Sequence, residues 1–512
     1  MRPLPETGDD RLVRRFGYRP QFLRSLRSFE SFALAFSFIS ITTGIFTTFG
    51  FLLANAGPRG IWTWPIVILG QTLVAMVYAA LAAKIPLAGY SYQWASRLAN
   101  PTVGWWLGWM SFAFLTIVTV SVDYAFVQVA FQPLLGIAYT PLGAAVQTGL
   151  VMAVQATMII LSTAVTTRIN NAAVVFEVVG MVELAIVLLS AAFLAGRGDW
   201  SNLWSTGIVP ATGWWQWLGP FMLATLLGAY TIVGFESSAN LAEETHEPRK
   251  VVPRAMVRAV VASGTIGMIF LFAVTLAVGD VEAASNDAAP VAFILKSVLG
   301  SGIERVFLLF ICVSIFCCGM VIMATNSRLV WAMARDRRLP GHQLIARVPR
   351  ATGGPTWATL MVALLSGGIV AVLRNHTDAL VNLFTASTLM PAILYAGTVL
   401  LYIGVARKIR QEPGYFHLGR WEQPVILGAL LWLAYELVIL IAPSDFRAAQ
   451  RYALGALLLG LVVFGLMWLI EPDAMRENTG AEGEEALAVA AEQPEDARAA
   501  DEALAPAGSM RG

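Results

Sequence analysis

Charged residues are scarce in this chain, which excludes an ordinary soluble domain. Asp, Glu, Lys and Arg make up 13% of the 512 residues, and 57% are hydrophobic. Soluble domains contain roughly 25% charged residues. The composition therefore predicts an integral membrane protein. The formal net charge of +1 combines basic loops with an acidic C-terminal tail, and contact with anionic lipid explains the basic loops more simply than nucleic acid does.

Cysteine and histidine are also rare, and their positions argue against metal or redox chemistry. Cys312, Cys317 and Cys318 fall inside one apolar run, and the four histidines lie in or beside polar connections. No metal-ligand spacing occurs, nor any GxSxG, HExxH or GxxxxGKS motif. We therefore expect no metal, no cofactor and no enzymatic activity.

The ten-residue alternation of a membrane β-barrel is absent too, and long apolar runs take its place. A helix rises 1.5 Å per residue, so roughly 20 apolar residues cross about 30 Å of hydrocarbon. Runs of that length predict an all-α integral membrane protein with twelve transmembrane helices. They cover residues 29–54, 62–83, 103–130, 143–166, 172–195, 217–241, 255–279, 303–334, 356–374, 380–406, 423–443 and 452–470.

The distribution of basic residues predicts that both termini are cytoplasmic. Arginines crowd residues 1–28, which lack the apolar core of a cleaved signal and are expected to remain as a tail. After Pro472 the chain is rich in Ala, Glu and Asp, which predicts a disordered acidic tail. The predicted location is the cell membrane, plasma or inner.

Two apolar runs contain residues that interrupt a helix near the middle of the membrane. Residues 37–46 (SFISITTGIF) gather hydroxyl residues and a glycine, and Gly228 and Gly234 flank the segment Tyr-Thr-Ile-Val. Matching interruptions in the first helix of two five-helix halves are typical of transporters built from inverted repeats. The alternative is that these small residues only allow close helix packing.

A break at this depth has a physical requirement. Freed backbone groups cost several kcal/mol each unless protein, ion or ligand satisfies them, so a break persists where it lines a cavity. The start of each half-helix offers free N–H groups and the positive end of a dipole. The pattern favours a site for an anionic or zwitterionic solute, and it explains why Glu236 follows Gly234 inside an apolar run.

Three stretches carry a family resemblance. Residues 234–255 contain a glycine, an aromatic residue and an acid, followed by EETHEPRKVVPRA. Residues 86–109 contain PLAGYSYQW and GWWLGW, and residues 327–340 read SRLVWAMARDRRLP. Together they resemble the amino acid/polyamine/organocation (APC) superfamily of permeases across residues 29 to about 406, nearest the amino acid/choline transporter branch. Two positions depart from the family pattern, where Ala80 replaces an acid and Arg337 replaces a glycine.

The resemblance implies a LeuT-like fold, which is a five-plus-five inverted repeat with discontinuous helices 1 and 6, followed by helices 11 and 12. The implied organisation is a cytoplasmic tail (1–28), a first repeat (29–195), an extracellular loop (196–216), a second repeat (217–406), two further helices (423–470) and the disordered acidic cytoplasmic tail (471–512).

The resemblance also implies alternating access around a site at the membrane midplane. A substrate carboxylate would meet the amides around Thr42, Thr43 and Gly44, and an amino group would face carbonyls near residues 230–233 and carbonyls of the first span. Tyr230 falls on the aromatic gate position, and Glu236 would be a gate carboxylate on the cytoplasmic half-helix. The expected substrate-binding residues are Ile41, Thr42, Thr43, Gly44, Asp123, Tyr230, Ile232, Val233 and Gly234.

Asp123 is an acid within the third predicted span. An unpaired carboxylate at a helix centre costs about 2.5 to 3.5 kcal/mol, so Asp123 must face the bundle interior. Two interpretations remain open. Asp123 pairs with a substrate ammonium or carries a proton, or it makes a hydrogen bond between helices.

Glu177 is the candidate for energy coupling. It lies six residues before Glu183, so the two do not share a helix face. In proton-driven members of the resembled family a lysine of this helix replaces sodium, and Glu177 lies near that position. Neutralisation of Arg168 or of another cytoplasmic arginine is the alternative role. Sodium is disfavoured, because only Ser314 offers a hydroxyl ligand nearby on the eighth span.

These observations predict a secondary active transporter for an amino acid or a derived amine, such as gamma-aminobutyrate, choline or a polyamine. Proton coupling or exchange would drive it. A channel would need a symmetric ring of charges or carbonyls, which this chain does not repeat. A transporter-like solute sensor without net transport is the alternative function.

Overall fold

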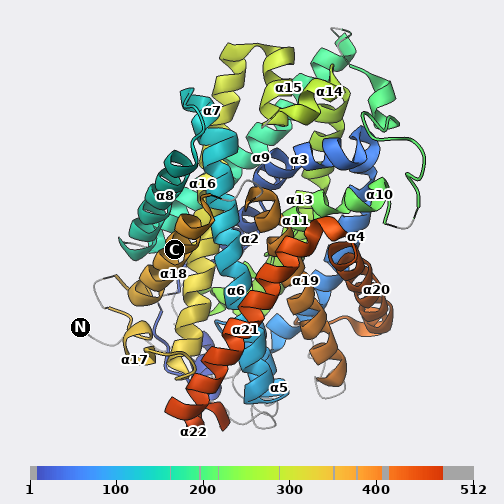
Figure 1. Cartoon of the computed structure of the whole chain (residues 1–512). Coiled ribbons are helices and arrows are strands. Elements are labelled where there is room, and N and C mark those ends of the chain that lie inside the picture. Colours follow the sequence, from blue (N-terminus) through green and yellow to red (C-terminus); the bar gives the residue numbers. More distant parts are fainter. Residues whose placement is uncertain are drawn as a thin grey trace, which may run out of the picture.

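The chain forms a bundle of helices (Figure 1). The computed structural model describes residues 8–22, 24–161, 163–194, 196, 198–216, 218–287, 289–349, 352–375, 379–405 and 414–476. Within these ranges the only β-type pairing is an isolated bridge between Leu26 and Thr245. Eleven helices of the described part are long and apolar enough to cross a membrane. The predicted all-α integral membrane protein is therefore confirmed.

Helices of the first half include one that is broken and one that contains a π-helical turn. A single residue, Ser40, separates α2 from α3. Helix α6 continues through a π-helical turn, Val127–Phe131, into α7. The elements are α1 (Gly8–Arg15), α2 (Ser28–Ile39), α3 (Ile41–Ala56), η1 (Pro58–Thr63), α4 (Trp64–Lys84), α5 (Tyr90–Leu98), α6 (Pro101–Phe126), α7 (Gln132–Leu135), α8 (Pro141–Leu161) and α9 (Thr163–Leu194).

The second half begins with short helices and ends with two long ones that lie outside the centre. They are η3 (Trp200–Leu203), α10 (Pro220–Leu223), α11 (Thr225–Thr231), α12 (Ser237–Asn240), η4 (Ala242–Glu244), α13 (Pro248–Leu276), α14 (Val281–Asn286), α15 (Pro290–Leu299), α16 (Ser301–Arg335), α17 (His342–Ile345), α18 (Thr356–Leu373), α19 (Ala379–Val405), η6 (Gly419–Trp421), α20 (Glu422–Ile441), η7 (Ser444–Phe446), α21 (Arg447–Ile470) and α22 (Pro472–Arg476).

The long helices match eleven of the twelve predicted spans. The predicted span 217–241 is instead divided among α10, α11 and α12, and its longest apolar helical stretch is Pro220–Thr231. Helix α9 begins at Thr163, earlier than the apolar run 172–195 that predicted it. An apolar run predicts only the part of a helix that crosses the hydrocarbon, and the more polar first turns of α9 extend the helix beyond that part.

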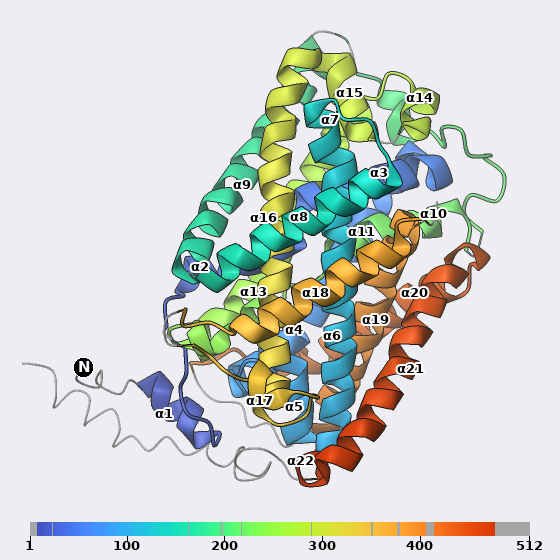
Figure 2. The ribbon, with the colours of Figure 1, turned by 60° about the vertical axis from the view of Figure 1, so that its left-hand side comes forward.

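Helix α6 lies at the centre of the bundle and positions the site. It contacts α5, α16, α18 and α19, while α13 packs against α4 and α2. Figures 1 and 2 show α5, α17 and α22 at one end of the bundle, called here the lower end, and α14 and α15 at the other, the upper end. Long helices running between the two ends bring residues from distant parts of the chain to the same depth.

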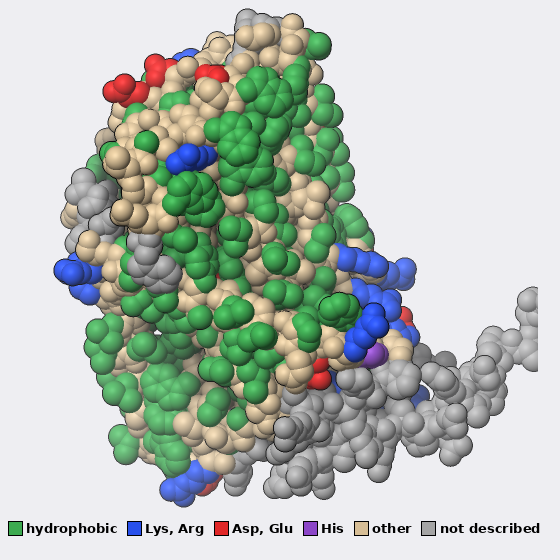
Figure 3. Space-filling model, turned by 90° about the vertical axis from the view of Figure 1, so that its right-hand side faces the viewer, with side chains coloured by type: hydrophobic (Ala, Val, Ile, Leu, Met, Phe, Trp, Pro, Cys, Tyr) green, Lys and Arg blue, Asp and Glu red, His purple; other side chains and the backbone are tan. Residues whose placement is uncertain are grey.

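The outer surface is apolar around the middle of the molecule (Figure 3). Leu469 is 83% exposed and Leu364 is 75% exposed. On the face drawn, hydrophobic side chains cover most of the middle, and most Lys and Arg lie toward the lower end. Such a surface would aggregate in water, so it indicates contact with lipid acyl chains.

The described parts of the two predicted tails are ordered against the lower end. Helix α1 lies beside this end (Figure 2), and the segment after it buries Phe16 and packs Phe22 on Trp331 with ring centroids 4.6 Å apart. Helix α22 buries Ala474 and Met475. The disordered acidic tail was predicted to begin at residue 471, but residues 472–476 are helical because these apolar side chains pack; residues 477–512 lie outside the described residues.

Candidate functional site

The first break lies at Ser40, between α2 and α3. Ser40 has φ 34° and ψ 92°, a conformation with positive φ that serine rarely adopts. Its side chain caps α3, because Ser40 Oγ accepts hydrogen bonds from the amide of Thr43 at 3.2 Å and from Thr43 Oγ1 at 2.7 Å. The predicted interruption at 37–46 is therefore present, and Ser40 is the residue that makes it.

Glu177 occupies the start of α3. Its Oε1 accepts hydrogen bonds from Ser40 Oγ at 3.0 Å and from the Thr42 amide at 3.1 Å. Gly44 N donates to Ser40 O at 3.0 Å. The amides of Thr42, Thr43 and Gly44, predicted to meet a substrate carboxylate, thus all have partners from the chain itself. A carboxylate at this position is what the helix dipole favours.

Glu177 also lies beside a small space at the join of three helices. A cavity of about 20 Å³ is lined by Glu177, Thr42 and Ser314, among others. That volume is enough for one water molecule, which needs roughly 10–15 Å³. Ser314 Oγ lies 3.4 Å from Ser40 Oγ. Arg168, the alternative partner of Glu177, is exposed, and the hydroxyls of Ser40 and Ser314 lie beside the carboxylate instead.

The second break separates α11 from α12. Helix α11 ends at Thr231, and residues 232–236 are not helical. Gly234 has φ 83°, a conformation that favours glycine. Its amide donates to Tyr395 Oη at 3.0 Å, so α19 satisfies a backbone group that the break frees. Ile232 and Val233 are both buried.

The two breaks lie against each other. A Cβ atom on Gly44 would overlap the Thr231 side chain, and a Cβ atom on Gly234 would overlap the ring of Phe38. Gly44 is in α3 and Phe38 is in α2, so each half of the first broken helix contacts one side of the second break. Ile41 is buried beside them, in contact range of Gly267. The structure thus brings together the predicted residues 41–44 and 230–234.

Tyr230 joins three helices above the breaks. Its hydroxyl lies 3.1 Å from Ser121 Oγ of α6, and its ring packs against Phe384 of α19 with centroids 4.9 Å apart. Tyr230, Phe384 and Ala125 form a small apolar cluster separate from the main core.

Glu236 lies below the second break among aromatic side chains. Its Oε2 accepts a hydrogen bond from Tyr395 Oη at 2.8 Å, and no described residue pairs with its Oε1. The Tyr395 ring packs edge-on to Tyr78, 5.3 Å between centroids. Tyr395 therefore connects the backbone of Gly234 to the carboxylate of Glu236.

Asp123 faces away from the breaks. Its Oδ1 accepts a hydrogen bond from Gln155 Nε2 of α8 at 2.8 Å, and it packs against Gly319 of α16. Ser121, which contacts Tyr230, lies two residues earlier, so the two side chains are about 200° apart around α6. The hydrogen bond between helices is therefore present, and the second oxygen, Asp123 Oδ2, is buried without a hydrogen-bond partner among the described residues.

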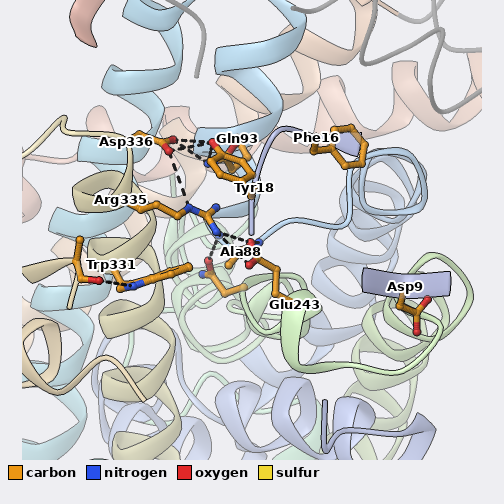
Figure 4. A network of polar contacts seen from close by, with 12 residues as sticks. Asp9, Phe16, Tyr18, Ala88, Gln93, Glu243, Trp331, Arg335 and Asp336 are labelled. Carbon is orange, nitrogen blue, oxygen red and sulfur yellow. Dashed lines mark hydrogen bonds and ion pairs between the residues drawn. The ribbon is translucent and has the colours of Figure 1, made fainter. Parts of the chain in front are cut away.

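A polar network closes the lower end (Figure 4). Arg335 of α16 donates to both oxygens of Glu243 at 3.0 Å, and Glu243 Oε1 accepts from the amide of Ala88 at 3.1 Å. Arg328 and Glu244 form a second buried ion pair at 3.0 Å. These residues come from all three stretches that carried the family resemblance, and the network forms although residue 80 is alanine.

The segment after α1 adds Tyr18 to this network. Tyr18 Oη donates to Asp336 at 2.9 Å, and Tyr92 Oη and Gln93 Nε2 donate to the same carboxylate at 2.6 Å and 3.0 Å. The Arg335 guanidinium lies over the Tyr18 ring at 3.7 Å. Burial, together with the charge of Asp336, raises the pKa of Tyr18 above its ordinary value. Tyr18 therefore remains a neutral donor at neutral pH.

Arg337, the second departure from the family pattern, shows why glycine is usual there. Its φ is 58°, in the left-handed region that favours glycine. Its side chain lies 3.7 Å from Glu471.

Several contact residues have no signal in the sequence. Ser40 could have been singled out as one of the hydroxyl residues in 37–46. The other contact residues lie far along the chain from their partners. The separation is 32 residues for Gln155 and more than a hundred for Tyr18, Phe384 and Tyr395. No group of three or more His, Cys, Asp or Glu side chains suited to a metal ion occurs among the residues whose positions are described.

Comparison with known proteins identifies the family. A sequence profile of the family described as amino acid permease matches residues 26–464. The chain is 26% identical over 473 residues to the amino-acid permease BAT1 of Arabidopsis thaliana, covering 87% of this chain and 90% of the relative. It is 25% identical over 497 residues to amino-acid permease 2 of Neurospora crassa (90% and 87%), and 25% identical over 491 residues to the thiamine transporter thi9 of Schizosaccharomyces pombe (86% and 81%).

The family profile covers most of the chain and includes both breaks and the two ion pairs of the polar network, and these proteins are transporters rather than enzymes. The resemblance read from the three sequence stretches is thereby confirmed. This chain belongs to the amino acid permease family of the APC superfamily.

Proposed function

We propose that the protein is a secondary active transporter that moves an amino acid or a derived amine across the cell membrane by alternating access. Gamma-aminobutyrate, choline and polyamines are candidate amines. The observation that carries the proposal is the contact between the two broken helices, with Gly44 against Thr231 and Gly234 against Phe38. The permease family supports an amino acid or a similar solute. Because one relative is a thiamine transporter, solutes other than amino acids also remain candidates.

The proposed architecture is the twelve-helix, five-plus-five inverted repeat of the LeuT-like fold. Residues 29–195 and 217–406 would be the two halves, with 423–470 as helices 11 and 12. Support comes from the position of the breaks, since each one interrupts the first span of a proposed half. We place the lower end in the cytoplasm, because the arginine-rich N-terminal segment packs there.

The proposed solute site lies between the breaks, where its amino group would face backbone carbonyls of residues 230–233. A solute carboxylate would go to the start of α3, where Glu177 now binds Thr42 N. Two negative charges 4 Å apart repel by about 4 kcal/mol at an effective dielectric constant of 20. Both cannot remain ionised at one helix start, so an anionic group can enter only if Glu177 takes up a proton or swings away.

This competition links solute binding to protons. If Glu177 takes up a proton as the solute carboxylate arrives, each solute travels with a proton, and the charge at the α3 start stays constant. Ser40 and Ser314 beside Glu177 offer hydroxyls to the protonated acid. Proton symport is the form of coupling that this geometry favours, and exchange of one solute for another is the alternative.

Two gates would enclose the site. Tyr230 and Phe384 would close it on the outer side, and the ion pairs of Arg335 with Glu243 and of Arg328 with Glu244 would close it on the cytoplasmic side. Glu236, hydrogen-bonded to Tyr395, lies between the second break and the inner ion pairs and serves as the gate carboxylate.

Uptake by the purified protein in liposomes tests the proposal. A panel of radiolabelled amino acids and amines is offered with and without an imposed pH gradient. We expect at least one solute to accumulate, and accumulation to require the gradient if protons are coupled. Counterflow without a gradient would identify an exchanger. Binding without uptake or counterflow across the panel would overturn the proposal in favour of a solute sensor.

A further inference from the structure

A large apolar groove opens on the membrane-facing side of the bundle, away from the breaks. Its volume is about 590 Å³, and it is lined by residues of α6, α18, α19 and α21. Leu364 and Val372 at its edge are 75% and 73% exposed. In Figure 1, α18 lies beside α6 and α21 crosses in front of it, which fits a groove whose floor includes Ile117 of α6.

Two glycines keep the groove open. A Cβ atom built on Gly368 of α18 or Gly455 of α21 meets no atom within 4 Å. Small residues in membrane helices usually serve to bring two helices into close contact. Here a Cβ atom at either position would point into open space, so these glycines enlarge the space available to an occupant of the groove. A space of this size between apolar helices matches the volume of ligand pockets, roughly 300 to 1,000 Å³.

One charged side chain stands at the rim. Among the described residues that line the groove, Arg451 is the only charged one, and the hydroxyl-bearing Tyr452 lies next to it. Arg451 is exposed, and no carboxylate among the described residues pairs with it. Because it belongs to the second turn of α21, it sits near the membrane end of the helix, where a long basic side chain reaches the headgroup region.

We propose that this groove is a binding site for a phospholipid with an anionic headgroup. An acyl chain lies along the apolar floor over Gly368 and Gly455, and the phosphate accepts charge-assisted hydrogen bonds from the Arg451 guanidinium. Charge complementarity selects this occupant, because the apolar lining alone would accept any acyl chain, whereas an unpaired guanidinium at headgroup depth favours a negative phosphate. The site is distinct from the solute site and independent of the transport mechanism.

Native mass spectrometry of the full-length protein in detergent tests the site. The protein is titrated with dioleoylphosphatidylglycerol or dioleoylphosphatidylcholine, and retained lipids are counted. We expect one phosphatidylglycerol to be retained more tightly than phosphatidylcholine. Arg451→Gln should weaken that one site by about tenfold, as loss of a charge-assisted hydrogen bond does. Arg447→Gln, one turn earlier on the same helix and outside the groove lining, is the matched control and should retain the lipid.

A second pair of variants tests the acyl chain. Gly455→Leu fills the groove without changing charge and should remove the tightly retained lipid, whereas Gly465→Leu, on the same helix and also in open space, should not. Equal retention by all variants, or no preference between the two headgroups in the unchanged protein, would mean general lipid contact and overturn the proposal. A dimer that Gly455→Leu disrupts while lipid retention stays unchanged would make a second copy the occupant and overturn it equally.

Discussion

Ser40 and Glu177 together satisfy backbone amides that the first break leaves free. Ser40 takes a backbone conformation that costs of order 1–3 kcal/mol, and that turn frees the amides at the start of α3 inside the bundle. Its own hydroxyl and the Glu177 carboxylate satisfy two of those amides, on Thr43 and Thr42. A buried acid is stable here because it accepts two hydrogen bonds and meets the positive end of a helix. The start of α3 is thus occupied by an acid of the chain itself, and in the proposed function a solute carboxylate would have to replace it.

Glu177→Gln replaces this acid by a neutral group of nearly the same shape. The amide oxygen can still accept from Ser40 and Thr42, but the side chain can no longer gain or lose a proton. We expect solute counterflow to persist and accumulation driven by a pH gradient to fall by at least about tenfold. Liposome uptake with and without the gradient measures both. Glu183→Gln, on an exposed face of α9, is the control and should behave as the unchanged protein. Gradient-driven accumulation by Glu177→Gln would contradict proton coupling at this residue.

Asp123 carries a different expectation because it binds Gln155 rather than facing the breaks. Asp123→Asn keeps an oxygen that accepts from Gln155 Nε2, so uptake of amines relative to zwitterionic amino acids should not change. Asp123→Leu leaves the Gln155 side chain without that acceptor, and we expect a loss of stability of about 1–3 kcal/mol in thermal unfolding. A selective loss of amine uptake in Asp123→Asn would instead place the carboxylate in the solute site.

At the scale of elements, the sequence predicted which helices break but not how the breaks are held. Length and hydropathy are properties of single segments, and so eleven long helices and both interruptions could be read from the chain. The contacts of Glu177 with Thr42 and of Tyr395 with Gly234 depend on how helices rotate against each other. That rotation is set by packing of distant segments, and a single sequence does not contain it. The contacts of the N-terminal segment were not predicted for the same reason, since its partners Asp336 and Thr245 lie more than two hundred residues away.

Gly234→Ala tests the contact between the two breaks. The new methyl group would meet the ring of Phe38, and alanine at φ 83° adds backbone strain of order 1–3 kcal/mol. We expect solute binding to be lost and the unfolding temperature to fall. Adding Phe38→Ala should recover part of the stability, because it removes the overlap and leaves the strain. Gly149→Ala, in open space on α8, is the control. Unchanged solute binding by Gly234→Ala would show that the site does not depend on this contact.

At the scale of the whole molecule, two buried ion pairs hold the lower end closed, and separating either pair costs free energy. Glu243 and Arg335 are 3% and 8% exposed, and Tyr18 and Trp331 cover the guanidinium from two sides. Since the pKa of Tyr18 is raised in the folded chain by burial and by Asp336, its contribution is fully present below its unfolded pKa of about 10 and is lost only as the pH rises through its folded pKa. At neutral pH titration of Tyr18 therefore does not weaken these contacts, and any opening of this end would require helices to move.

Arg335→Ala should open this end. Removing Arg335 leaves the buried charge of Glu243 without a partner, which destabilises the closed conformation by about 3–5 kcal/mol. The protein relieves this destabilisation if the lower end opens and exposes the carboxylate to water. Ser237, fully buried on α12, reports the change when Ser237→Cys is placed in a variant without the three native cysteines. A membrane-impermeant maleimide added on the lower side should label Cys at 237 several-fold faster in Arg335→Ala. Lys250→Ala removes the exposed pair with Glu247 and should leave labelling unchanged, since exposed pairs contribute little. Equal labelling with and without Arg335→Ala would mean that closure of this end rests on apolar packing alone.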